Sequence, residues 1–220
     1  MVQQNSTGTR INCGCVIHGP AYNWTYVERL HSMLSRHLTN FGKLHVWTEA
    51  NRPVPEHMVK HVLEPMNTPL GWWYKMQMFD STHYAGDLLY MDLDVVVVNN
   101  IDWIVQHNPD EFWTINDFLY LQQHPGWHRI NSSIMWFNTQ RMSWLWNQFG
   151  PDDTGRHRGD QDYLEHHIKH RQYLDPKRVI SWRWQAQNKP IDDPVSVLVF
   201  HGQPKPHELL DNVVIKQHWC

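Results

Sequence analysis

Leu88-Leu89-Tyr90-Met91-Asp92-Leu93-Asp94-Val95-Val96-Val97-Val98 is the stretch that decides the fold. Apolar residues flank two aspartates, and four consecutive valines are typical of a buried β-strand. The pattern therefore predicts a core strand that is broken or bent at the acidic pair. Because residues two apart in an extended chain point the same way, Asp92 and Asp94 should face one side, about 7 Å apart along the backbone.

Two carboxylates at the end of a core strand need a positive partner. Unpaired and about 4 Å apart, they would repel by about 1 kcal/mol in water and about 4 kcal/mol at an effective dielectric of 20. Their burial would cost several kcal/mol more. A divalent cation is the simplest partner, and hard oxygen ligands favour Mn²⁺ or Mg²⁺ over zinc. The aspartates could instead cap a turn or pair with basic side chains, but α/β proteins bind ligands at strand ends, which favours the metal.

Length and composition place the chain among globular proteins. With 220 residues, 41% hydrophobic and 19% charged, we expect a single domain over residues 1–220, with residues 1–10 flexible. No apolar segment approaches the roughly 20 residues of a membrane span, and the polar N-terminus lacks the apolar centre of a secretory signal. Three cysteines cannot all pair, which indicates a reduced, cytoplasmic setting.

Charge is unevenly distributed. The net charge of −3 argues against a dedicated nucleic-acid binder, but residues 155–190 carry eight Lys or Arg against four Asp or Glu. That excess suits a phosphate-bearing ligand, although an ordinary solvated surface explains it equally well. Most of the 13 tryptophans should be in the core, and a minority could stack on sugars or bases.

The predicted strands and helices alternate along the chain, which indicates an α/β fold. Strands are expected at residues 11–17, 44–47, 88–98, 112–115, 134–137 and 195–200. Helices are expected after Asn23 and at residues 55–63, 71–80, 100–105, 141–149 and from 159 onward, with a loop at 150–155.

Polar groups follow the first predicted strand, and one also lies in the predicted helix that precedes the central strand. His18 and Gly19 lead from strand to helix N-terminus, an arrangement that can receive a phosphate or nucleotide. Lys75 should project from the polar side of a half-buried helix, either toward a ligand or into solvent.

Polar groups also follow the last predicted strand. His201 could complete the coordination of a metal held by Asp92 and Asp94. Gly202 permits close backbone approach, and Lys205 could neutralise a phosphate. A separate pair, His166 and His170, shares a predicted helix face and could bind zinc, but no matching Cys or acid lies nearby in sequence, so a structural role is favoured.

Five blocks of sequence together resemble the GT-A glycosyltransferases of the glycogenin-like and lipopolysaccharide galactosyltransferase-like group. The similarity is greatest to short phage and bacterial proteins of this kind. In order, the blocks are Gly71-Trp72-Trp73-Tyr74-Lys75, Leu89-Tyr90-Met91-Asp92-Leu93-Asp94-Val95-Val96, Asn131-Ser132-Ser133, Gly159-Asp160-Gln161-Asp162 and Phe200-His201-Gly202-Gln203-Pro204-Lys205-Pro206-His207.

The resemblance implies a GT-A fold, in which helices flank a Rossmann-like mixed central sheet. It also implies transfer of a hexose from a nucleotide-diphosphate sugar, most simply a UDP-sugar, with retention of configuration and with Mn²⁺ or Mg²⁺ on the diphosphate. The metal ligands it implies are Asp92, Asp94 and His201. The implied catalytic residues are Asp160, Gln161 and Asn131, and the implied donor-binding residues are His18, Gly19, Tyr22, Lys75, Gly202 and Lys205.

The acceptor and two other function classes stay open. The acceptor could be a saccharide, a lipid-linked sugar, a protein or a hydroxymethylated base in viral DNA, because cations and aromatic side chains in residues 155–190 also suit nucleic acid. A sugar nucleotidyltransferase would use a similar metal pair, but its glycine-rich N-terminal signature is absent. A non-catalytic carbohydrate-binding protein would account for the tryptophans.

Overall fold

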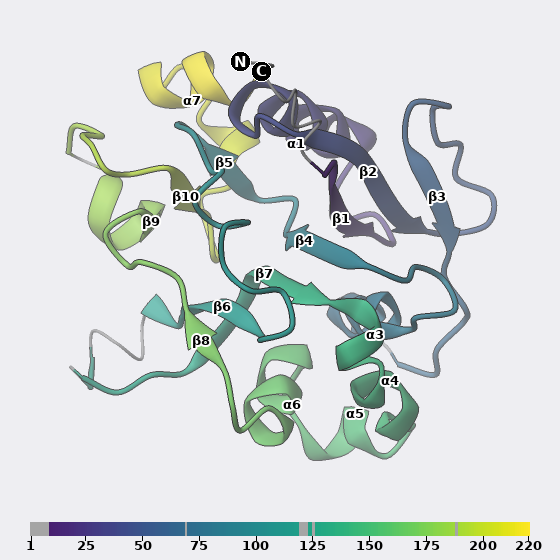
Figure 1. The fold of residues 1–220 in the computed structure, drawn as a ribbon. Coiled ribbons are helices and arrows are strands. Elements are labelled where there is room, and N and C mark those ends of the chain that lie inside the picture. Colours follow the sequence, from purple (N-terminus) through teal and green to yellow (C-terminus); the bar gives the residue numbers. More distant parts are fainter. Residues whose placement is uncertain (1–8, 69, 119–122, 125, 188) are drawn as a thin grey trace, which may run out of the picture.

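The structure is a computed structural model that describes residues 9–68, 70–118, 123–124, 126–187 and 189–220. Residues 1–8 of the stretch expected to be flexible lie outside the described residues. Seven strands form one mixed sheet in the order β3-β2-β1-β4-β7-β6-β8 (Figure 1). They are β1 (Ile11–Ile17), β2 (Phe41–Thr48), β3 (Val59–Val62), β4 (Asp87–Met91), β6 (Trp113–Asn116), β7 (Ile130–Asn138) and β8 (Gln172–Tyr173).

Most neighbours in this sheet are parallel. β1 runs parallel to β2 and β4, whereas β7 is antiparallel to both β4 and β6. Three further strands form a second sheet in the order β5-β10-β9. They are β5 (Val95–Val97), β9 (Val179–Ser181) and β10 (Val197–Val199). The predicted α/β fold with a mixed central sheet flanked by helices is therefore confirmed.

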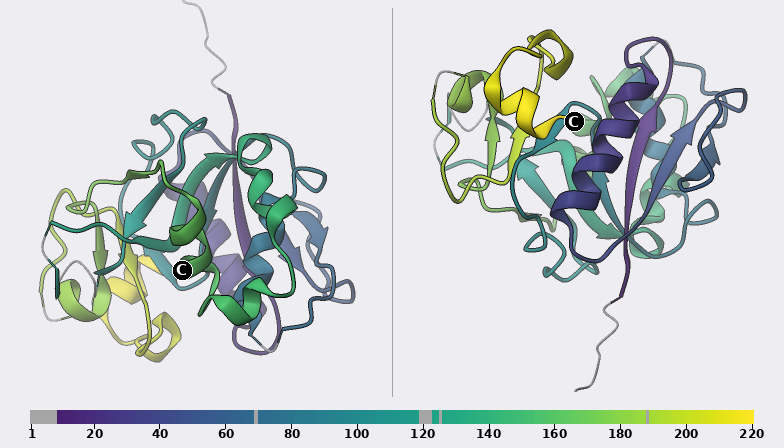
Figure 2. Two further views of the ribbon diagram at one scale, coloured as in Figure 1. Left: turned by 90° about the horizontal axis from the view of Figure 1, so that it is seen from below. Right: turned by 90° about the horizontal axis from the view of Figure 1, so that it is seen from above.

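Helices cover both faces of the large sheet (Figures 1 and 2). α1 (Trp24–His37) lies on one face beside α7 (Val213–His218), and Arg36 donates to the carbonyl of His218 at 2.6 Å. The opposite face carries the 3₁₀-helix η1 and four short helices. These are η1 (Gly71–Phe79), α3 (Thr139–Met142), α4 (Trp144–Gln148), α5 (Asp153–Arg156) and α6 (Asp160–His167). A π-helical turn, η2 (Trp182–Ala186), follows β9, and a 3₁₀ turn, η3 (Pro206–Glu208), precedes α7.

Alternation along β4 divides the core into two hydrophobic clusters. Leu89 and Met91 join the cluster under α1, whereas Leu88 and Tyr90 join the cluster under η1, α4 and α6. Because successive side chains of a strand point to opposite faces, a continuous apolar run is what a strand covered on both faces requires. The cluster under α1 also includes valines of β5 and β10, so one core joins the two sheets.

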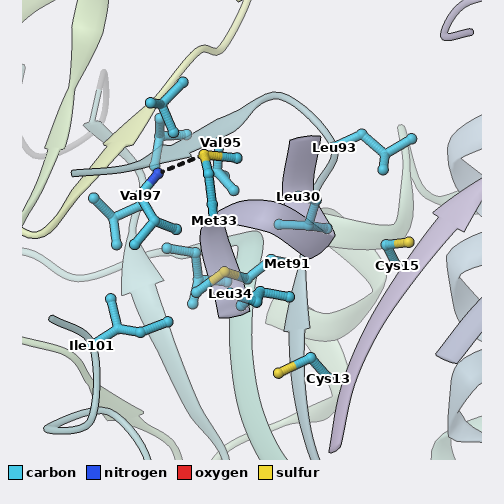
Figure 3. Packing of buried hydrophobic residues seen from close by; sticks show 14 of the residues in the cluster. Cys13, Cys15, Leu30, Met33, Leu34, Met91, Leu93, Val95, Val97 and Ile101 are labelled. Atoms are coloured by element: carbon cyan, nitrogen blue, oxygen red, sulfur yellow. Dashed lines mark hydrogen bonds between the residues drawn. The ribbon is translucent and has the colours of Figure 1, made fainter. Parts of the chain in front are cut away.

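α1 packs against that shared core through its apolar stripe (Figure 3). Leu30, Met33 and Leu34 are fully buried, and Met33 sulfur lies 3.2 Å from the backbone nitrogen of Val97. On the other side of β1, a Cβ added to Gly14 would lie 3.0 Å from the Trp47 ring. Glycine at this position therefore lets β2 and the ring of Trp47 pack closely against β1.

Two predicted helices are wrong. Residues 55–63 contain β3, whose register pairs Val59 with His45 and Val62 with Thr48 on the edge of β2. An open sheet edge and two β-branched valines outweighed the local helical pattern. Residues 100–105 form successive turns, because the Asn100 side chain accepts from the backbone nitrogen of Asp102 at 2.9 Å. Such local bonds compete with helix formation.

Other predicted elements change their limits. The helix expected at 141–149 is interrupted at Ser143, and the loop expected at 150–155 includes α5. α6 ends at His167, so His170 does not share a helix face with His166 and that predicted pair is wrong. Within the described residues, no helix has the length and apolar character that crossing a bilayer requires.

Candidate active site

The acidic pair lies where the chain crosses from the large sheet to the small one. The backbone nitrogen of Asp92 donates to the carbonyl of Ser133 at 2.8 Å, which ties it to β7. The carbonyl of Asp94 accepts from the backbone nitrogen of Phe200 at 3.1 Å, which ties it to the end of β10. The predicted bend between two buried strand segments is confirmed, since β4 ends at Met91 and β5 begins at Val95.

Lys75 is buried at the centre of an ionic network. Its side-chain nitrogen lies 2.9 Å from Asp92 Oδ1 and 3.2 Å from Asp160 Oδ2, and it donates to Ser132 Oγ at 3.1 Å. Ser132 Oγ in turn donates to Asp160 Oδ2 at 2.7 Å. Burial lowers the pKa of Lys75, but attraction to Asp160 and Asp92 outweighs it and raises the pKa above its usual value. The prediction of a half-buried helix is wrong, because η1 is buried over most of its length. Of the two alternatives for Lys75, the structure favours projection toward a ligand, since its buried side chain lines two adjoining cavities.

Asp94 is held by two donors. Its Oδ2 accepts from the Tyr22 hydroxyl at 2.9 Å and from the ammonium of Lys205, which also donates to the carbonyl of Phe200 at 3.0 Å. Burial and repulsion by Asp92 nevertheless raise the pKa of Asp94, despite Lys205 and Tyr22. Two lysines thus face three carboxylates, Asp92, Asp94 and Asp160, and compensate their negative charge only in part.

The carboxylates suit a divalent cation. Asp92 Oδ2 and Asp94 Oδ1 accept no hydrogen bond from any part of the chain that the structure describes. Free carboxylate oxygens near uncompensated negative charge are the ligands that Mn²⁺ and Mg²⁺ prefer. The Asp pair thus fits the predicted ion.

His201 lies close to the end of β10 but is not assembled with the pair. Its Nε2 lies 2.6 Å from Ser181 Oγ, and its ring stacks on Phe118 with centroids 5.4 Å apart. Among the described residues, Asp92, Asp94 and His201 do not have ligand atoms that all lie within 4.8 Å of one another. Burial lowers the pKa of His201, which favours the neutral imidazole that binds metals. Its role as third ligand stays a prediction.

Two cavities meet at this network. The smaller one, about 390 Å³, is lined by His18 and Tyr22, which follow β1, and extends to Asp94. The larger one, about 680 Å³, is lined by Asp160 and Gln161. Both are lined by Trp72, Lys75 and Asp92, so the network separates two adjoining chambers. A ligand with two parts could therefore place its junction at Asp92.

The loop after β1 forms one wall of the smaller cavity. His18 stacks on Tyr74, with ring centroids 3.7 Å apart. Gly19 has a φ of 67°, and its backbone nitrogen donates to Glu49 Oε1 at 2.6 Å. Arg52 donates to the carbonyl of Gly19 at 3.1 Å, so Glu49 and Arg52 hold this turn in place. Glycine is favoured at such a positive φ.

The predicted catalytic residues separate into two groups. Asp160 and Gln161 line the larger cavity, and Gln161 Nε2 donates to Asp117 Oδ2 at 2.9 Å. Asn131 lines neither cavity, because its side-chain oxygen accepts from the backbone nitrogen of Ser133 at 3.0 Å. Ser132 and Ser133 face the larger cavity instead.

Several lining residues escaped the sequence analysis. Trp72 is 49% exposed at the junction of the cavities, although we expect most tryptophans to lie in the core. A Cβ on Gly159 would lie 2.9 Å from Trp72 Nε1, so glycine permits that close approach. Arg129 and Arg158 both pair with Asp162 at the wall of the larger cavity. The Gly-Trp-Trp and Gly-Asp-Gln-Asp blocks were the signals for Trp72 and Asp162.

The fold is that of solved glycosyltransferases. The galactosyltransferase LgtC, in complex with donor and acceptor sugar analogues, is 14% identical with a TM-score of 0.67, over 94% of this chain and 93% of that one. An active-site glutamine-to-glutamate mutant of LgtC is 13% identical with a TM-score of 0.66, again over 94% of this chain and 93% of that one. The glycosyltransferase GlyE of Streptococcus pneumoniae TIGR4 is 13% identical with a TM-score of 0.67, over 92% of this chain and 57% of GlyE.

At the level of sequence, no family model and no curated protein matches. The likeness in structure therefore carries the comparison, and it covers 92–94% of this chain. The chain has the GT-A-like fold of these glycosyltransferases.

Proposed function

We propose that the chain is a metal-dependent glycosyltransferase that moves a hexose from a nucleotide-diphosphate sugar, most simply a UDP-sugar, to an acceptor hydroxyl. The observation that carries this proposal is the pair of adjoining cavities that meet at Lys75 and Asp92. Such an arrangement suits a donor whose nucleotide and sugar lie on opposite sides of its diphosphate. LgtC, which shares the fold, was solved with donor and acceptor sugar analogues.

The smaller cavity suits the nucleoside. His18, stacked on Tyr74, and the ring of Tyr22 offer aromatic surface to a base. Glu49 and Arg52 hold the turn at Gly19, which lies between His18 and Tyr22 in the chain. In this proposal Gly19 contributes its turn geometry, because its N–H already donates to Glu49.

The metal would sit on the diphosphate. Asp92 and Asp94 would hold Mn²⁺ or Mg²⁺, with His201 as a candidate third ligand, and the ion would act as a Lewis acid toward the leaving diphosphate. Lys205, already beside Asp94, would neutralise a phosphate oxygen, and Gly202, with a φ of 72°, would admit the close approach of the diphosphate.

The larger cavity suits the sugar and the acceptor. In the transfer, the bond between the anomeric carbon and the diphosphate oxygen breaks, the acceptor oxygen bonds to that carbon, and the acceptor proton passes to the diphosphate. Asp160 and Gln161 would orient the sugar hydroxyls, and Lys75 would hold Asp160 in place. With retention of configuration the acceptor approaches from the face of the leaving group, so no strong protein base is needed.

A nucleotide-sugar panel tests the proposal. The melting temperature is measured for each donor with and without Mn²⁺, because a ligand at 100 times its dissociation constant stabilises the fold by about 2.7 kcal/mol. We expect a shift for at least one UDP-sugar that requires Mn²⁺, and Mn²⁺-dependent hydrolysis of that donor. Failure of every donor to bind would contradict the proposal. Binding without any hydrolysis or transfer would leave a carbohydrate-binding protein as the function, and synthesis of the sugar nucleotide would indicate a nucleotidyltransferase.

The acceptor is tested separately, once a donor is known. Transfer to hydroxymethylated duplex DNA should fall steeply between 50 and 200 mM salt, because phosphate contacts release counterions. Transfer to a neutral saccharide or a protein hydroxyl should not. The same donor assayed with each acceptor class therefore distinguishes them.

A further inference from the structure

A cluster of side chains that could hold a metal ion lies away from the two cavities. Asp153, His157 and His167 each offer one ligand atom, and these atoms all lie within 4.8 Å of one another. Asp153 belongs to α5, His157 follows it, and His167 ends α6, next to α5 in Figure 1. None of the three lines the cavities that meet at Lys75.

The histidine rings are positioned by the core. Tyr163 is fully buried, and its hydroxyl donates to the carbonyl of Leu145 at 3.0 Å. The His167 ring packs on Tyr163 with centroids 4.2 Å apart, and the His157 ring meets Tyr163 edge-on at 5.5 Å. The histidine centroids are 5.9 Å apart. Two imidazoles on one tetrahedral zinc, each bound at about 2.0–2.1 Å, lie at a similar separation.

The carboxylate is positioned as well. Asp153 Oδ2 accepts from the backbone nitrogen of Gly150 at 2.9 Å, which orients the carboxylate. The backbone nitrogen of His157 donates to the carbonyl of Asp153 at 3.0 Å, so both residues belong to one helical turn of the backbone. Hydrogen bonds to a ligand side chain, such as the one from Gly150 to Asp153, orient the ligands in natural metal sites.

We propose that Asp153, His157 and His167 bind a single Zn²⁺ ion, with water in the fourth position. Two imidazoles and one carboxylate match the donor set of zinc better than that of Mn²⁺, which prefers oxygen. The ion joins α5 to the end of α6. The ion would therefore restrain the segment between α5 and α6, which includes Arg158 and Gly159 at the wall of the larger cavity. The site is independent of the Asp92–Asp94 pair.

Titration of the full chain with Zn²⁺ alone, after removal of metal by a chelator, tests this site. Calorimetry should give one ion per chain and a raised melting temperature. His157→Ala and His167→Ala should each weaken Zn²⁺ binding by roughly tenfold or more. Both variants should melt like the wild type in chelator, which separates loss of the ion from failure to fold. Co²⁺ in place of Zn²⁺ should give the visible absorption of a tetrahedral site, and that absorption should disappear in both variants.

Two matched controls make the test decisive. His170→Ala removes an exposed histidine near the same helix and should leave Zn²⁺ binding unchanged. Asp94→Asn alters the proposed Mn²⁺ site and should also leave it unchanged, so failure of the glycosyltransferase proposal would not affect this result. The inference is overturned if the wild type binds no Zn²⁺, if His157→Ala and His167→Ala bind it as tightly as the wild type, or if only His170→Ala loses it.

Discussion

Lys75 Nζ lies 2.9 Å from Asp92 Oδ1 at the wall that the two cavities share. One aspartate of the acidic pair is thus bound by a buried ammonium that also bridges to Asp160. A buried cation between two carboxylates supports the fold, and it also places positive charge beside the proposed diphosphate position. Stability and chemistry are therefore linked through one side chain.

Replacement of Lys75 by methionine should destabilise the protein strongly. Removal of one partner from a buried ion pair leaves uncompensated charge and costs about 3–5 kcal/mol. Asp92 and Asp160 would both lose that partner. Urea unfolding measures the change in free energy. Lys169→Met, at an exposed lysine, should change it by less than about 0.5 kcal/mol. Equal stability of the two variants would refute the network.

Asp94→Asn should abolish the Mn²⁺-dependent thermal shift with a nucleotide sugar. The substitution removes the charge that the ion needs but keeps an oxygen for the Tyr22 hydroxyl and Lys205. We expect transfer to fall by a factor of about 10² or more, as when one stabilising group is lost from a transition state. Asp211→Asn, at an exposed aspartate, is the control. A full Mn²⁺ effect in Asp94→Asn would remove this carboxylate from the metal site.

Glu49→Gln should weaken donor binding without strong loss of maximal rate. Burial raises the pKa of Glu49, but bonds from Arg52 and from the Gly19 backbone nitrogen outweigh it and lower the pKa to about 2. The charged carboxylate therefore holds the turn beside His18. Loss of about 1 kcal/mol of this support corresponds to about fivefold weaker binding. Binding of UDP by calorimetry measures it, with Glu28→Gln on the exposed side of α1 as control. Unchanged UDP affinity would show that this turn does not bind the nucleotide.

Stability should fall between pH 6.5 and pH 4. His45 Nδ1 lies 2.8 Å from His61 Nε2, and burial, followed by the neighbouring histidine of each, lowers both pKa values to about 4. The unfolded chain therefore binds more protons across this window, so the stability is fully present above pH 6.5 and is lost as pH falls toward 4. At pH 5 each of the two histidines should contribute a loss of at most about 2 kcal/mol relative to pH 7.

Thermal unfolding across that pH range measures this dependence. His61→Gln should make it shallower, because the glutamine cannot take up a proton and only His45 then contributes. His170→Gln, at an exposed histidine, should keep the slope of the wild type. A His61→Gln slope as steep as that of the wild type would assign the pH dependence to other groups.

The prediction of the fold succeeded where local pattern and tertiary packing agree. The apolar runs at β1 and at β4–β5 are required by a sheet covered on both faces, and the apolar stripe of α1 fits its core. It failed at β3, where an edge of β2 offered a partner that no local pattern contains. The ionic partners of Lys75 were missed for the same reason, since they come from β7 and α6 and from the bend after β4.

By itself the sequence determined the bend at Asp92 and Asp94, the α/β alternation and the ordered blocks that resemble glycosyltransferases. Such features arise from residues close together in the chain, where side-chain alternation and helical spacing act directly. Only the tertiary structure decided that Lys75 bridges Asp92 and Asp160, that Trp72 stands between two cavities, and that His157 and His167 meet Asp153. Those contacts depend on the packing of separate elements, because packed elements bring together side chains whose spacing in sequence carries no signal.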